Sequence, residues 1–105
     1  MTNALKELVN ILTLERLETH RFKGRGSKND GAEGTYGGHL LGQSVAAAIE
    51  TVVQDKTIHS LHTYFLSAGQ PGEPIYYEVD VLRDGRTFCS RKVIARQGSR
   101  VLIEL

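Results

Sequence analysis

Two stretches of the chain repeat their apolar residues at the spacing of a helix. In the first, residues 3–14, Leu5, Leu8, Val9 and Leu12 fall at positions i, i+3, i+4 and i+7, which places them on one helical face. The second stretch, His39–Val53, carries few charges before its end and predicts a longer helix that is buried on most sides. Its apolar stripe consists of Leu41, Val45, Ala48, Ile49 and Val52.

The second half of the chain changes to the period of a strand. Apolar and polar residues alternate from Ile75 to Leu82, and β-branched and aromatic residues are frequent elsewhere. Asp84-Gly85 and Gly98-Ser99 predict tight hairpin turns. A long helix followed by an antiparallel meander is an α+β plan. The predicted strands are Leu17–Lys23, Thr57–Leu66, Ile75–Leu82, Thr87–Gln97 and Val101–Leu105.

Length and composition limit the chain to one ordinary globular domain, residues 1–105. Hydrophobic residues make up 40% and charged residues 24%, which excludes a disordered chain. No apolar run approaches the roughly 20 residues of a membrane span, and no secretory leader is expected. The single cysteine, Cys89, excludes an internal disulfide and a cysteine-based zinc site. We therefore expect an intracellular, cytoplasmic protein.

The net charge of +1 conceals a basic stretch near the C-terminus. Arg83–Arg100 contains six basic residues and one acid, Asp84, so its local charge is six minus one, or +5. Such a stretch either faces phosphate-bearing ligands or forms a solvated strand face. Phe88 is its only aromatic residue, so it offers few stacking surfaces for bases, and a nucleic acid is not an expected partner.

Three ordered blocks resemble the acyl-CoA thioesterase II family. Residues 36–44 read YGGHLLGQS, Ile58–Leu66 read IHSLHTYFL, and Pro74–Val79 with Leu82–Phe88 complete the pattern. The resemblance extends over essentially the whole chain and implies a hotdog fold, in which a curved antiparallel sheet wraps a long helix. It also implies hydrolysis of fatty acyl-CoA to free acid and CoA without a cofactor, in a peroxisome if the source is eukaryotic.

The chain departs from this family in one respect. Family members carry two hotdog units, and their catalytic Asp, Thr and Gln lie in the second, whereas only the first is present here. No position matches those residues, so we assign no catalytic residue. A non-catalytic module that binds acyl-CoA or supports assembly is therefore the alternative. Without a second unit, an apolar face and the last strand, Val101–Leu105, are expected to stay open and to favour a homo-oligomer.

The predicted substrate-binding residues are Gly37, Gly38, His39 and Gln43. A helix start offers unpaired N–H groups that can stabilise the developing negative charge of a thioester oxygen. The glycines would let a ligand approach, or they only permit a tight turn. His39 is expected to be neutral, because the helix dipole opposes its protonation. Gln43 faces the ligand or satisfies a buried carbonyl, and it replaces the lysine that a phosphate-binding P-loop requires.

The remaining candidates point to structural roles or stay ambiguous. His59 and His62 lie three apart in a predicted strand and so face opposite ways, which predicts no shared metal site. Each is either a lone base or a hydrogen-bonded structural histidine. Cys89, with Arg91 nearby, is either a packed thiol or a nucleophile for which no partner base is visible.

Overall fold

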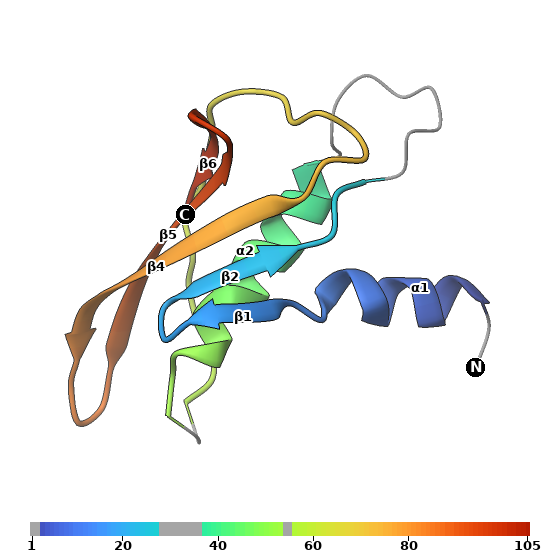
Figure 1. The fold of residues 1–105 in the computed structure, drawn as a ribbon. Coiled ribbons are helices and arrows are strands. Elements are labelled where there is room, and N and C mark those ends of the chain that lie inside the picture. Colours follow the sequence, from blue (N-terminus) through green and yellow to red (C-terminus); the bar gives the residue numbers. More distant parts are fainter. Residues whose placement is uncertain (1–2, 28–36, 54–55) are drawn as a thin grey trace.

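A long helix lies against one face of an antiparallel sheet. The structure is a computed structural model and describes residues 3–27, 37–53 and 56–105. Within them, the strands form one six-stranded sheet in the order β1-β2-β4-β5-β6-β3, with α2 behind it and α1 extending to the side (Figure 1). The predicted α+β class is confirmed. The elements are α1 Asn3–Leu12, β1 Glu15–Glu18, β2 Arg21–Gly24, α2 Gly37–Glu50, β3 Tyr64–Phe65, β4 Ile75–Asp84, β5 Cys89–Gln97 and β6 Arg100–Glu104.

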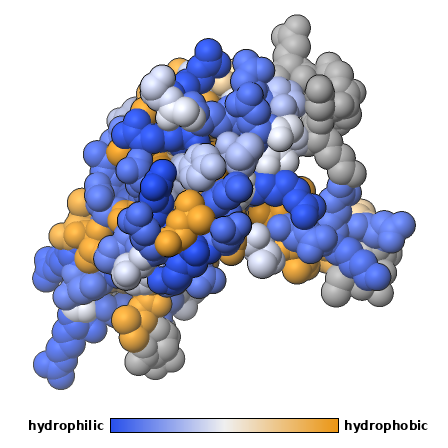
Figure 2. Space-filling view, in the orientation of Figure 1, coloured by the Kyte–Doolittle hydropathy of each residue, from blue (hydrophilic) through white to orange (hydrophobic). Residues whose placement is uncertain are grey.

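The core lies between α2 and the two central strands. β4 and β5 pair so that Tyr77 lies opposite Ala95 and Val79 opposite Val93, and all four side chains are buried. The outer face of the sheet, turned toward the viewer in Figures 1 and 2, is mostly hydrophilic. The period of two predicted from the sequence therefore separates an apolar inner face from a polar outer face. The buried apolar cluster is Phe22, Leu40, Ala47, Ile75, Tyr77, Val79, Val93, Ala95, Leu102 and Ile103.

The helix α2 turns a different face to the sheet than its apolar stripe predicts. Its buried residues are Leu40, Gln43, Ser44 and Ala47, whereas Ile49 of the predicted stripe is 56% exposed. The expectation that this helix is buried on most sides is therefore wrong. The sheet brings the large side chain of Tyr77 to this face, where its hydroxyl donates to Gln43 and the small side chains of Ser44 and Ala47 permit close packing.

The first helix is confirmed, but its apolar face is not covered. Leu5, Leu8 and Val9 are each about half exposed. The last turn of α1 is attached to α2, where Leu12 approaches Gly42 and the Ile11 carbonyl accepts a hydrogen bond from Gln43. No helix among the described residues is long and apolar enough to cross a membrane.

Two predicted strands differ from those observed. Leu17–Lys23 is not one strand, because β1 and β2 form a short hairpin that turns at residues 19 and 20. Of Thr57–Leu66, only Tyr64 and Phe65 join the sheet, and the residues before them run extended and unpaired. Strand composition alone predicted a strand here, but β6 is too short to pair with the whole segment.

The two predicted turns have different outcomes. Gly98 has φ 60° and closes a two-residue turn, as predicted. The other hairpin has a four-residue connection, residues 85–88, closed by a hydrogen bond of 2.8 Å from the Gly85 N–H to the Phe88 carbonyl. Gly85 lies outside the positive-φ region, so the two-residue turn predicted at Asp84-Gly85 is wrong.

The open edges of the sheet lie elsewhere than expected. β6 pairs with β5 on one side and β3 on the other, and Leu102 and Ile103 are fully buried. The predicted open edge at Val101–Leu105 is therefore wrong. Among the described strands, the edges are β1 and the two residues of β3, Tyr64 and Phe65, which are 60% and 58% exposed.

Candidate functional site

The first turn of α2 lies beside the edge strand β3. Gly37 is the first helical residue, and a Cβ added there would lie 3.1 Å from Cε1 of Phe65. The glycine thus permits a close approach of helix and strand. The first N–H groups of a helix have no partner within it, so this turn can also present donors to a ligand. Both interpretations of the Gly37-Gly38 pair remain compatible with the structure.

His39 is tied to the loop that follows β2. Its Nε2 lies 2.7 Å from the carbonyl oxygen of Arg25. Because a carbonyl can only accept, Nε2 must carry a proton, and in the neutral ring Nδ1 is then an acceptor. Most of the glycine-rich loop between Arg25 and α2, residues 28–36, lies outside the described residues.

Gln43 is fully buried, and its amide is saturated with protein partners. Its Nε2 donates to the carbonyls of Ile11 and Arg25 at 2.8 and 3.0 Å, and its Oε1 accepts from the Tyr77 hydroxyl at 2.6 Å. Burial raises the pKa of Tyr77, so the phenol stays a neutral donor. This geometry favours the interpretation in which Gln43 satisfies buried carbonyls, one helical turn below His39.

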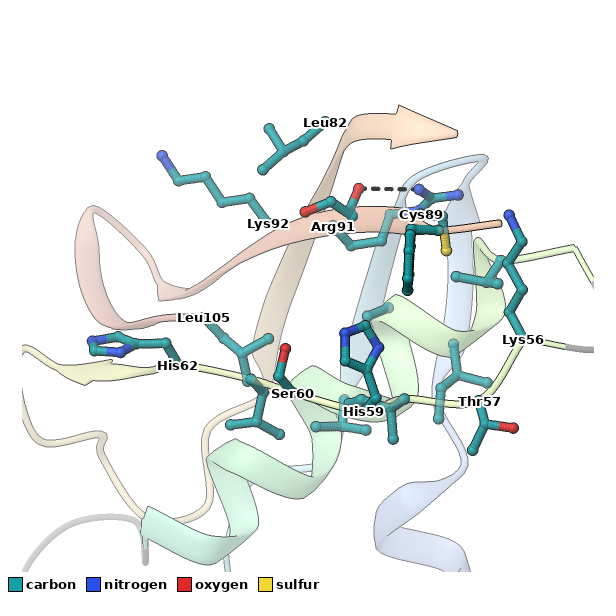
Figure 3. Close-up of a pocket in the computed structure, with 18 of the residues that line it drawn as sticks. Lys56, Thr57, His59, Ser60, His62, Leu82, Cys89, Arg91, Lys92 and Leu105 are labelled. Atoms are coloured by element: carbon teal, nitrogen blue, oxygen red, sulfur yellow. Dashed lines mark hydrogen bonds between the residues drawn. The ribbon is translucent and has the colours of Figure 1, made fainter. Parts of the chain in front are cut away.

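A second feature lies at the other end of α2, and the sequence did not single it out. A cavity of about 960 Å³ opens between the second half of α2, the extended segment 56–62 and the start of β5 (Figure 3). The signal was present in the apolar stripe of α2, most of which lines this cavity. The stripe residues at the cavity are Val45, Ala48, Ile49 and Val52.

Arg91 closes one wall of this cavity and is engaged at all of its donors. Its side chain is 6% exposed and lies 2.7 Å from the Asp84 carboxylate. Nε and Nη2 donate to the hydroxyl and carbonyl of Thr51, just beyond α2, at 2.8 and 2.9 Å. Nη1 donates to the carbonyls of Arg83 and Ser90. The guanidinium therefore fixes the C-terminal end of α2 to the β4–β5 hairpin.

The other predicted candidates do not assemble into a reactive centre. His59 packs its ring against Phe88 at 5.5 Å between centroids, and His62 against Tyr64 at 4.7 Å. His59 points from the extended segment toward β5, and His62 lies farther along that segment (Figure 3). Cys89 lines the cavity. Within the described part of the chain, no three His, Cys, Asp or Glu residues lie close enough to hold a metal ion.

Three of the six basic residues of the basic stretch pair with acids. Arg91 pairs with Asp84, Lys92 with Glu104 at 3.1 Å, and Arg96 with Glu78. These acids come from β4 and β6, the two neighbours of β5. For Lys92 and Arg96 the observation agrees with a solvated strand face stabilised by cross-strand ion pairs, whereas Arg91 is buried on the inner side of β5.

Comparison with known proteins identifies the family. The family described as "Acyl-CoA thioesterase N-terminal domain" matches residues 25–105, which include α2 and the four strands β3, β4, β5 and β6. The chain belongs to this family. A tesB protein of Mycobacterium avium subspecies paratuberculosis has a similar structure, with a TM-score of 0.90 and 38% identity over 97% of this chain and 40% of that one. This similarity confirms the hotdog fold.

Curated relatives place the family domain within longer chains. Acyl-CoA thioesterase 2 of Haemophilus influenzae is 36% identical over 92% of this chain and 34% of its own length. Peroxisomal acyl-coenzyme A thioester hydrolase 1 of Saccharomyces cerevisiae is 37% identical over 94% of this chain and 29% of its own length. This acyl-CoA thioesterase domain thus spans about a third of the relatives that it matches.

Proposed function

We propose that this chain is the N-terminal unit of an enzyme that hydrolyses fatty acyl-CoA to free fatty acid and CoA. The observation that carries the proposal is the family match over residues 25–105, together with relatives named for thioester hydrolysis. In this reaction water adds to the thioester carbonyl, the C–S bond breaks, and the thiolate leaving group takes up a proton.

The proposed contribution of this unit is to bind substrate at the start of α2. The N–H groups of Gly37, Gly38 and His39 would face the thioester oxygen, and Gln43 would support that turn from below through its bond to the Arg25 carbonyl. Losing one such donor costs about 10²–10³-fold in rate. A positioned general base contributes about 10²–10⁴-fold to the rate. In the family that this chain resembles, the catalytic Asp, Thr and Gln belong to the second unit.

The proposed partner is a second hotdog unit. Where no such unit is present, we propose that a second copy of this chain takes its place. Exposed apolar side chains at the β3 edge and along the cavity support this assembly. The proposed compartment is the cytoplasm, or the peroxisome in a eukaryote, in line with the name of the yeast relative.

The test is a thiol-release assay with acyl-CoA of medium and long chain length. The 105-residue chain alone is expected to hydrolyse substrate little faster than background. A chimera in which it replaces the matching third of the Haemophilus influenzae thioesterase is expected to be active, and Gly37→Val is expected to reduce its kcat. An inactive but folded chimera that still binds CoA would favour the non-catalytic alternative. Robust turnover by the isolated chain, abolished by His39→Ala, would show that this unit carries its own chemistry.

A further inference from the structure

A second, smaller pocket lies where the end of α1 meets the β1–β2 hairpin (Figure 1). Its volume is about 240 Å³, whereas whole small-molecule ligands occupy about 300–1,000 Å³. The pocket therefore suits one group of a ligand rather than an entire molecule. It shares no residue with the apolar cavity along α2. The polar side chains that line it belong to Asn10, Thr13, Glu15, Lys23 and Arg25.

Lys23 and Arg25 supply the positive charge of this pocket. Neither side chain forms an ion pair with an acid among the described residues, whereas Arg21, on the same strand as Lys23, pairs with Glu18. Glu15 lies opposite Lys23 in the β1–β2 register, but no ion pair joins these two side chains. Two cations and one acid give the lining a net charge of two minus one, or +1. Cations left without a partner at a concave surface favour an anionic ligand.

The end of α1 admits an anion because its last carbonyl groups already accept hydrogen bonds. Free carbonyls at a helix C-terminus would repel an anion. Here Thr13 donates from its hydroxyl to the Val9 carbonyl at 2.6 Å and from its N–H to the Asn10 carbonyl at 3.3 Å. The Ile11 carbonyl accepts from Gln43. The Asn10 side chain has no hydrogen bond within the described part of the chain, so its amide is left to donate to a ligand.

Arg25 connects this pocket to the proposed thioester site. It lines the pocket, and its carbonyl oxygen accepts hydrogen bonds from His39 and Gln43 of α2 at 2.7 and 3.0 Å. Lys23 lies about 7 Å farther along the chain. In CoA, about thirteen bonds, or roughly 16 Å when extended, separate the sulfur from the nearest phosphorus. A CoA molecule whose thioester lies at the start of α2 therefore has an arm long enough to bring its diphosphate to the pocket.

We propose that this pocket binds a phosphoryl group, with Lys23 and the Arg25 guanidinium as cationic donors and the Asn10 amide as a neutral donor. Arginine can donate two parallel hydrogen bonds to phosphate oxygens, and lysine acts as a point charge. The phosphoryl group belongs either to CoA, in which case this inference rests on the proposed function, or to a free phosphate-bearing small molecule.

The experiment compares three probes by NMR titration of the 105-residue chain at low salt. They are inorganic pyrophosphate, CoA, and pantetheine, which is the arm of CoA without its phosphates. Pyrophosphate and CoA are expected to shift the backbone amide signals of Lys23, Gly24 and Arg25, whereas pantetheine is expected to leave them unchanged. Added salt should weaken the binding of pyrophosphate, because it screens exposed charges.

Variants that remove one charge each locate the phosphoryl group, and their spectra also report whether they fold. Lys23→Gln and Arg25→Gln are each expected to lower the pyrophosphate affinity by about three- to tenfold. Lys6→Gln and Arg86→Gln make the same changes at exposed side chains outside the pocket and should alter it by less than about twofold. Glu15→Gln removes the acid from the lining and is expected to raise the affinity by about two- to fivefold.

CoA identifies the source of the phosphoryl group. If Lys23→Gln and Arg25→Gln weaken the binding of CoA as they weaken that of pyrophosphate, the group belongs to CoA. If they weaken only pyrophosphate, the source is a free phosphate-bearing molecule, and the proposed function stands. If pyrophosphate shows the expected pattern among the variants but CoA does not bind, the pocket assignment stands and the proposed function fails.

Three results would overturn the pocket assignment. The first is a pyrophosphate titration that leaves the amide signals of residues 23–25 in place. The second is a loss of affinity in Lys23→Gln and Arg25→Gln no larger than in the two control variants. The third is a weaker affinity in Glu15→Gln, because removal of a negative charge beside a bound anion cannot weaken direct binding. CoA that still shifts the signals at the start of α2 would then preserve the proposed function without this pocket.

Discussion

Gln43 joins segments that are far apart in the sequence. Its amide reaches the end of α1, the loop after β2 and the Tyr77 hydroxyl on β4. In a buried setting each of these groups costs about 1–3 kcal/mol when it is left without a partner. A single uncharged residue on the inner face of α2 therefore helps to fix where α1 and the start of the proposed site lie.

Replacing Gln43 by methionine tests this assignment. The variant keeps a side chain of similar length but leaves the Ile11 carbonyl and the Tyr77 hydroxyl unpaired, so the free energy of unfolding should fall by about 2–4 kcal/mol in urea denaturation. Ser44→Ala is the control, because the buried Ser44 hydroxyl has no partner in the described part of the chain. That variant should be neutral or slightly stabilising. Equal losses from the two substitutions would contradict the assigned role of Gln43.

The burial of the Tyr77 hydroxyl predicts that the folded protein loses stability in alkaline solution. Burial raises the pKa of Tyr77 in the folded protein above its value of about 10 in the unfolded chain. Its contribution is therefore complete below pH 10 and is lost as the pH rises further, because only the unfolded chain then releases the proton. The slope rises from near zero below pH 10 toward about 1.4 kcal/mol per pH unit well above it. Unfolding measured between about pH 9 and 11 should show this slope reduced in Tyr77→Phe but not in Tyr76→Phe, an outer-face control; identical slopes in both variants would refute it.

At the level of the elements, the order of helices and strands was predictable because it depends on local periodicity. The period of two in β4 and the Gly98 turn are properties of neighbouring residues. Which face of α2 packs on the sheet is not local. Small residues such as Ala47 face the core because the sheet brings Tyr77 to it, and the more apolar stripe with Ile49 is left for the cavity. The candidate site was predictable only in part. Its glycines form a local sequence motif, whereas the cavity is created by tertiary packing and has no local signal.

The Arg91 contacts are another feature that the sequence could not supply. In the sequence, Arg91 belongs to a basic stretch, which indicates either a solvated strand face or contact with a phosphate-bearing ligand. Its position on the inner side of β5 places it instead at the C-terminal end of α2, where the helix dipole favours a cation and the Thr51 carbonyl needs a donor.

Arg91→Met should destabilise the protein by about 2–3 kcal/mol, because the carbonyls of Thr51 and Arg83 lose their donor. Arg91→Lys should recover only part of this, since an ammonium cannot reproduce the planar fork. Arg96→Met removes a more exposed arginine, which pairs with Glu78, and should cost less than about 1 kcal/mol. Urea denaturation of the three variants provides the measurement. Equal effects of Arg91→Met and Arg96→Met would show that the contacts of Arg91 do not hold α2 to the hairpin.

For the whole molecule, the distribution of exposed apolar residues is uneven. The segment 58–66 contains the edge strand β3 and carries five apolar residues that are each about half exposed or more: Ile58, Leu61, Tyr64, Phe65 and Leu66. The other edge, β1, has the sequence ERLE and carries three charged residues in four. Charge protects an edge from pairing, and an apolar edge invites it. The molecule therefore has one edge suited to self-association.

Self-association through β3 is accordingly the last prediction. At roughly tens of micromolar, light scattering of the 105-residue chain should give at least the mass of a dimer. Tyr64→Lys places a charge on the open edge and should shift the population toward the monomer, because a lysine there must be buried for a second strand to pair. Leu17→Lys makes the same change on β1 and should leave the mass unaltered. A monomeric parent chain at this concentration, or a dimer that resists Tyr64→Lys but not Leu17→Lys, would contradict self-association through β3. If the prediction holds, the same edge that pairs two copies is the surface on which a second hotdog unit would complete the proposed site, because β3 carries Phe65 to the first residue of α2.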